Sequence, residues 1–123
     1  MKKLTSILLL LSLSNCALLQ HPDKWSKEDK TREVTWLTLH TIDCGTTLDI
    51  ADQPNKYYEI NPLLGEHPSR SKVYKYMLVT AILHPIIVNY LPSKQRKWYQ
   101  ILSIGVSGAC VVNNLNIGLT IAF

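Results

Sequence analysis

The segment MLVTAILHPIIVNYLPSKQRKWYQILSIGVSGACVVN, residues 77–113, consists of two apolar stretches separated by a proline and a basic turn. Proline removes a backbone donor and disfavours helix in the residue before it, so Pro92 ends one helix and the next begins after it. We predict helices over residues 70–91 and 94–113, with Ser69 or Ser71 capping the first, Ser93 capping the second and a kink at Pro85.

The residues before this hairpin predict one more helix and a long connection. Ser26, followed three residues later by Asp29, is a capping-box pattern, and Pro54 sets the opposite limit of a helix over residues 26–52. Residues 53–69 contain three prolines, a glycine and two asparagines, which is typical of a loop. The sequence therefore predicts an all-α fold of three helices. The alternation of large apolar and small residues over 117–123 favours a short terminal strand or a frayed tail.

The two apolar helices have two interpretations. No charged residue occurs in residues 77–93 or 98–123, whereas the turn between these segments carries Lys94, Arg96 and Lys97. The positive-inside rule expects such a basic turn on the cytoplasmic side of a transmembrane hairpin. Each apolar core is nevertheless only about fifteen residues long, and segments of that length also occur as core helices. The hairpin either spans a membrane or packs within a three-helix bundle.

The N-terminus has the layout of an export signal. Lys2 and Lys3 precede a short apolar run, residues 4–13, and the sequence Leu13-Ser14-Asn15-Cys16 follows. This sequence resembles the lipobox of bacterial lipoproteins, although Asn15 replaces the more usual Gly or Ala. The resemblance implies cleavage before Cys16, acylation of its thiol and anchoring in the bacterial cell envelope, with the inner or outer membrane left open. The predicted organisation is a signal peptide over 1–15, a lipidated tether over 16–25 and a small helical domain over 26–123.

Composition excludes several classes of function. The 123 residues have a formal net charge of +4, which falls to +2 without the signal peptide, and this is too little to indicate a nucleic-acid partner. We find no nucleophile motif, phosphate loop, dinucleotide fingerprint or zinc spacing, so we expect no cofactor and no metal. Cys44 and Cys110 follow no spacing motif and are either paired or free thiols.

Semi-polar stripes on the three helices are the candidate site. Helical spacing aligns Trp36, His40, Asp43, Thr47 and Ile50; then Tyr76, Thr80 and His84; and then Ser103, Ser107 and Asn114, with Cys110 between them. We predict that the stripes converge on a polar seam, in which His84 takes a partner from Asp43, Glu59 or the carbonyl freed by Pro85.

The loop adds Glu59, Asn61 and His67 to the candidate residues. Asp43 and Thr47, followed by Glu59-x-Asn61-Pro62 and Gly65, resemble a pattern of small bacterial and phage helical membrane proteins without an assigned activity. Glu59 and Asn61 suit a bracing role and Pro62 and Gly65 a turn. The sequence favours a non-enzymatic envelope lipoprotein that contacts the membrane and another envelope protein. The alternative is a small membrane-embedded enzyme or ligand- or metal-binding protein that uses Asp43, Glu59 and His84.

Overall fold

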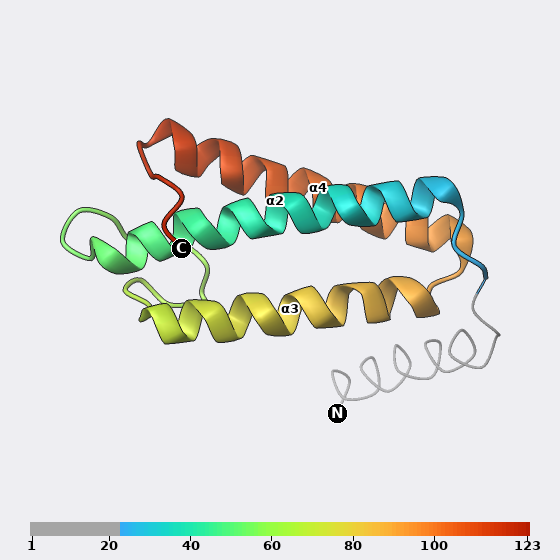
Figure 1. Ribbon diagram of the computed structural model, residues 1–123, viewed down its shortest axis with the longest axis horizontal. Helices are drawn as coiled ribbons and strands as arrows, with labels where there is room; N and C mark the ends of the chain where they lie inside the picture. The colour runs from blue at the N-terminus through green and yellow to red at the C-terminus, as the bar shows by residue number, and fades with distance from the viewer. Residues whose placement is uncertain (1–22) are drawn as a thin grey trace, which may run out of the picture.

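The computed structural model describes residues 23–123, which form three helices: α2 (Lys27–Asp52), α3 (Arg70–Tyr90) and α4 (Ser93–Asn116) (Figure 1). The all-α, three-helix prediction is confirmed. The predicted signal peptide, Cys16 and most of the tether lie outside the described residues.

Two of the three predicted helix caps are present. The Ser26 hydroxyl accepts a hydrogen bond from the Asp29 amide, and the Ser26 amide donates to the Asp29 carboxylate, both at 3.0 Å, which completes a capping box. The Ser69 hydroxyl accepts from the amide of Lys72. The predicted Ser93 cap is wrong: Pro92 is the N-cap of α4, and the Ser93 amide donates to the Asp23 carboxylate instead.

Helix α2 is the centre of the bundle. It packs along both α3 and α4, whereas α3 and α4 share few contacts with each other. The apolar core lies where α2 meets α3 and the 53–69 loop, and consists of Cys44, Leu48, Leu64, Val73 and Met77. Because α3 and α4 make few contacts with each other, a groove remains between their facing sides along α2.

The C-terminal residues close one end of the bundle but form no strand. They run in irregular conformation across α2, where the amide of Ala122 donates to the Gly45 carbonyl at 3.1 Å. A Cβ on Gly45 would lie 2.5 Å from Cγ2 of Ile121, so the tail approaches closely because residue 45 has no side chain.

Several polar side chains are buried and many large apolar side chains are exposed, in addition to the apolar core. Arg96, Gln100 and Thr46 are fully buried, whereas Leu102 and Val106 are each 66% exposed. None of the helices in residues 23–123 is long and apolar enough to cross a membrane, so the predicted transmembrane hairpin is not supported. Polar residues interrupt each of the two apolar cores. Arg96, which belongs to the basic turn in the sequence, is buried.

Candidate functional site

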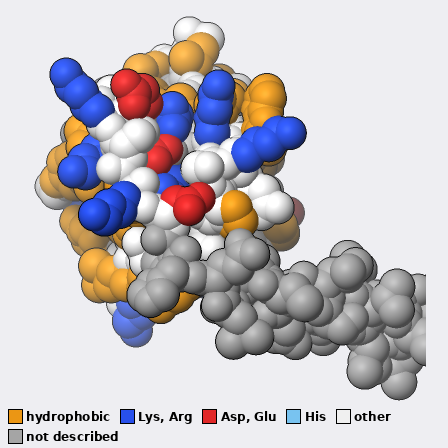
Figure 2. Space-filling view, turned by 90° about the vertical axis from the view of Figure 1, so that its right-hand side faces the viewer, with side chains coloured by type: hydrophobic (Ala, Val, Ile, Leu, Met, Phe, Trp, Pro, Cys, Tyr) orange, Lys and Arg blue, Asp and Glu red, His pale blue; other side chains and the backbone are white. Residues whose placement is uncertain are grey.

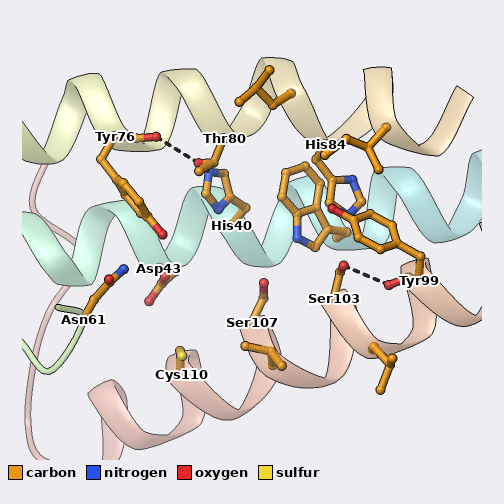
Figure 3. A pocket seen from close by; sticks show the side chains of 15 residues that line it. His40, Asp43, Asn61, Tyr76, Thr80, His84, Tyr99, Ser103, Ser107 and Cys110 are labelled. Atoms are coloured by element: carbon orange, nitrogen blue, oxygen red, sulfur yellow. Dashed lines mark hydrogen bonds between the residues drawn. The ribbon is translucent and has the colours of Figure 1, made fainter. Parts of the chain in front are cut away.

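A groove of about 580 Å³ runs between the three helices (Figure 3). Trp36, His40 and Asp43 of α2 form its floor, and the facing sides of α3 and α4 form its walls. The predicted stripes converge here in part. The walls contain Tyr76, Thr80 and His84 from α3 and Ser103, Ser107 and Cys110 from α4, whereas Thr47, Ile50 and Asn114 do not line the groove. Helical periodicity was sufficient to identify this common face.

His84 is the most constrained polar side chain of the groove. Its ring stacks on Trp36 with centroids 3.6 Å apart and faces the Tyr99 ring at 4.9 Å. Its Nδ1 lies 2.8 Å from Oε1 of Glu33, a half-buried residue of α2. The predicted partners, Asp43 and Glu59, lie elsewhere; Glu33 was missed because sequence alone does not give the axial offset between α2 and α3.

The other nitrogen of His84 has no partner. Nε2 is buried, and it is the one buried side-chain nitrogen or oxygen in residues 23–123 without a hydrogen bond. Leaving such a group unsatisfied costs about 1–3 kcal/mol. His84 projects from α3 toward the groove, and its ring is one of the side chains that line it (Figure 3).

His40, in contrast, is satisfied within the protein. Its Nε2 lies 3.0 Å from both the Met77 carbonyl oxygen and the Thr80 hydroxyl, which ties α2 to α3. Its ring also stacks on Trp36 with centroids 4.8 Å apart. Trp36 therefore lies between the two histidine rings, and His40 has a structural role in the floor of the groove.

Asp43 lies toward the other end of the groove. Its carboxylate accepts a hydrogen bond from the Asn114 amide at 3.2 Å, and Asn114 also donates to the Thr46 hydroxyl. Burial, together with the negative charge of Glu59, raises the pKa of Asp43 to about 6. No arginine or lysine pairs with Asp43 among the described residues.

The remaining predicted site residues lie in or near the loop. Glu59 accepts from the Asn61 amide at 2.8 Å, and the Asn61 side chain accepts from the Leu63 amide, so both brace the turn that Gly65 completes at a positive φ of 75°. Asn61 also lines the groove. Thr47 is buried in α2, and His67 is exposed and does not line the groove.

The structure does not bring these residues together as metal ligands. In the part of the chain from residue 23 onward, no group of three His, Cys, Asp or Glu side chains could hold a metal ion. Cys44 and Cys110 are free thiols, and burial raises the pKa of each. The groove therefore presents hydrogen-bonding and aromatic side chains rather than a metal centre.

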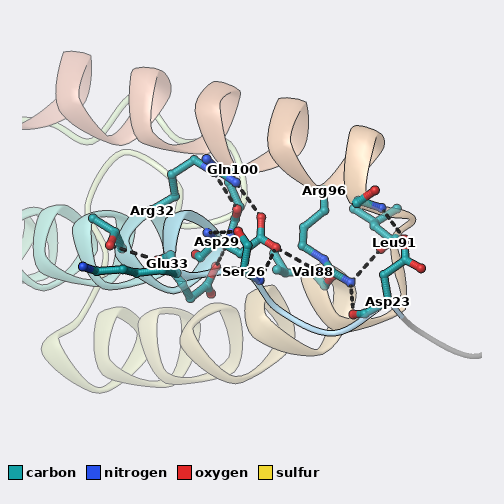
Figure 4. A network of polar contacts seen from close by, with 12 residues as sticks. Asp23, Ser26, Asp29, Arg32, Glu33, Val88, Leu91, Arg96 and Gln100 are labelled. Carbon is teal, nitrogen blue, oxygen red and sulfur yellow. Dashed lines mark hydrogen bonds and ion pairs between the residues drawn. The ribbon is translucent and has the colours of Figure 1, made fainter.

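A buried polar network holds the Glu33–His84 pair in place (Figure 4). The Gln100 amide donates to Glu33 and to the Asp29 carbonyl, and Nε of Arg32 donates to the Gln100 side-chain oxygen, all at 3.0 Å. This network fixes Glu33 from the side opposite His84.

Arg96 joins the three helices at the far end of the same network. Its guanidinium contacts Asp29 at 3.1 Å and donates to the carbonyl groups of Val88, Leu91 and Asp23. Burial raises the pKa of Asp29, but hydrogen bonds from Ser26, Arg96 and Arg32 outweigh burial and leave that pKa below its usual value. Sequence patterning missed both residues, because Arg96 belongs to the basic turn and Gln100 follows three residues after Lys97.

No protein-family model, curated protein or solved structure matches the chain. The groove and the outer surface are therefore interpreted from their own chemistry.

Proposed function

We propose that this protein is a non-enzymatic lipoprotein of the bacterial cell envelope, acylated at Cys16, whose helical domain rests against a lipid membrane through the outer faces of α3 and α4. The exposed apolar side chains of α3 and α4 carry the proposal. The outward side chains of α3 beyond Met77 include no charged residue, and those of α4 beyond Trp98 include none either. Exposed apolar surface of this extent marks an interaction site.

The large apolar side chains that form this outer face are each at least 39% exposed. On α3 they are Leu78, Val79, Ile82, Ile86 and Tyr90, and on α4 they are Trp98, Ile101 and Val112, none of which lines the groove. Tyr90 and Trp98 lie where α3 ends and α4 begins, the position that aromatic residues favour at a membrane–water interface.

Basic side chains at one end of the bundle favour lipid over a protein partner. Figure 2 looks onto the end where α2 begins and α3 turns into α4, and shows Lys and Arg side chains around a smaller group of Asp and Glu side chains, with hydrophobic side chains on the flanks. Five exposed lysines belong to this end: Lys24, Lys27, Lys30, Lys94 and Lys97. A basic cluster beside an apolar face suits anionic lipid headgroups, each lysine contributing about 1 kcal/mol near such a surface.

Flotation of the full chain with vesicles of phosphatidylcholine and phosphatidylglycerol tests the proposal. The native chain should incorporate labelled palmitate and float. Cys16→Ser should lose the label but still float, because the outer face binds lipid independently of the anchor. Adding Ile82→Glu and Ile86→Glu to Cys16→Ser should leave the chain in the unbound fraction.

Val34→Glu in the Cys16→Ser background is the matched control. Val34 is 66% exposed on α2, outside the proposed face, so this variant should float as Cys16→Ser does. An unlabelled native chain would refute acylation at Cys16. A Cys16→Ser chain that stays unbound would refute the lipid-binding face.

A further inference from the structure

The groove contains an incomplete hydrogen-bonding site, and this observation is independent of acylation and of the outer face. His84 is only 6% exposed and lines the groove, yet its Nε2 has no partner. We propose that the groove binds a single-chain amphiphile whose polar end is an uncharged hydroxyl that donates a hydrogen bond to Nε2 of His84.

The partner of Nδ1 determines which kind of group Nε2 needs. An ionised carboxylate only accepts hydrogen bonds, so at 2.8 Å the Nδ1–H of His84 donates to Glu33. In the neutral ring, Nε2 then carries a lone pair and accepts. Gln100 donates to the other oxygen of Glu33 and so holds the carboxylate in this orientation. For the neutral ring, the group that completes Nε2 is therefore a donor, such as a hydroxyl.

The charges around the groove disfavour an anionic ligand. No lysine or arginine lines it, and the buried Arg96 is fully engaged by Asp29 and backbone carbonyls. Glu33 lies behind His84, and Asp43 and Glu59 lie toward the opposite end. A carboxylate or phosphate in the groove would meet acidic groups at both ends without a compensating cation. A hydroxyl meets the requirement of Nε2 without adding charge.

The remaining walls suit an alkyl chain. Leu83 and Ile87 from α3 face Leu102 and Val106 from α4 along the opening, and Trp36 and Tyr99 add aromatic surface beside His84. Along α3 the lining extends from Tyr76 to Ile87, which corresponds to ~16 Å of helix. The cavity volume of about 580 Å³ is typical of sites that enclose a small molecule. An elongated, mostly apolar groove with one hydrogen-bonding group fits a single chain.

Nitrogen NMR of the ¹⁵N-histidine-labelled full chain in phosphatidylcholine nanodiscs tests the site with dodecanol as the probe. His84→Phe identifies the His84 signals by their loss. Dodecanol should shift the Nε2 resonance to lower frequency, as hydrogen bonding to a lone pair does. The resonance of Nδ1, which is hydrogen-bonded to Glu33, should stay nearly unchanged. Dodecane should leave the Nε2 resonance unchanged. Dodecanoate at pH 8 should need at least a tenfold higher concentration than dodecanol to produce the same Nε2 shift.

Two α4 variants test whether the groove is the location. Ser107→Phe places a large ring in the groove and should abolish the Nε2 shift, whereas Val112→Phe adds the same ring on the outer surface and should preserve it. A native Nε2 resonance that saturating dodecanol does not move would overturn the proposal, as would dodecanoate acting at the same concentration as dodecanol. These ligand comparisons use the native chain and stand even if Ser107→Phe fails to fold.

Discussion

Nδ1 of His84 on α3 lies 2.8 Å from Oε1 of Glu33 on α2, although the two residues are 51 positions apart in the chain. This contact joins the buried polar network at the basic end of the bundle to the groove between the helices (Figures 3 and 4). Gln100 of α4 donates to one oxygen of Glu33, and His84 contacts the other. The position of α4 therefore sets the orientation of the His84 ring through Glu33.

Glu33→Gln should destabilise the chain by about 1–3 kcal/mol, because the new amide group opposes either the Nδ1–H of His84 or the amide of Gln100. Urea unfolding gives this free energy. Glu66→Gln, at an exposed loop position, is the control and should leave the midpoint within error. Equal stability of both variants would show that the Glu33–His84 contact contributes nothing.

Arg96→Met should lower the free energy of unfolding by about 3–5 kcal/mol. The substitution leaves Asp29 buried without its cation and leaves the carbonyl groups of Val88 and Leu91 without the guanidinium as donor. The neighbouring Lys97→Met removes an exposed charge and should change the unfolding free energy by less than about 0.5 kcal/mol. The prediction fails if the two variants unfold at the same urea concentration.

Two aspartates of α2 should respond to pH with opposite signs. The pKa of Asp43 is about 6 in the folded chain, against 3.8 for an ordinary aspartate. The folded state therefore binds this proton more tightly than the unfolded state does. As a result, Asp43 lowers the free energy of unfolding as the pH rises from about 4 to 6. Asp43→Asn should remove this dependence and stabilise the chain at pH 7 by about 1–3 kcal/mol. The side-chain carbonyl that this substitution introduces can still accept the hydrogen bond from Asn114.

Asp49 provides the contrast. The backbone amide of Thr120 donates to its carboxylate at 2.7 Å and, with Gln53, lowers the pKa of Asp49, so its contribution to stability is present above about pH 4 and is lost as pH falls. Asp49→Asn should therefore destabilise the chain at pH 7. Urea unfolding at pH 4 and pH 7 checks both variants; a destabilising Asp43→Asn at pH 7 would contradict the assignment.

Glycine-to-alanine substitutions in α2 and α4 should have opposite effects on the stability of the chain. Alanine is normally favoured over glycine in a helix by about 1 kcal/mol, and a Cβ on Gly105 would meet no atom within 4 Å, so Gly105→Ala should stabilise the chain. A Cβ on Gly45 would lie 2.5 Å from Ile121, so Gly45→Ala should displace the C-terminal tail and lower the melting temperature. Amide exchange at Ala122, which donates to Gly45, reports the displacement directly.

Local signals were sufficient for the helices and for the common face of the groove. Pro54 and Pro92 limit α2 and α3, and the Ser26–Asp29 capping box starts α2 at the predicted position. Helical spacing placed Trp36, His40 and His84 on the faces that converge.

The missing features all depend on tertiary packing. Which carboxylate faces His84 depends on the offset between α2 and α3, and this offset selects Glu33 rather than Asp43. Arg96 belongs to a turn that is basic in sequence, but Asp29 and nearby carbonyl groups provide enough partners to bury it. Ser93 does not cap α4, and its amide instead donates to the carboxylate of Asp23, which is 70 residues away in the chain.

The most direct test of the proposed membrane association is the environment of the α3 outer face. A nitroxide at Ile86 of the Cys16→Ser chain should become accessible to oxygen and inaccessible to a water-soluble nickel complex when phosphatidylcholine–phosphatidylglycerol vesicles are added. A nitroxide at Val34 on α2 should stay accessible to the nickel complex. If Ile86 and Val34 both remain exposed to the aqueous reagent, the apolar face of α3 and α4 does not bind lipid.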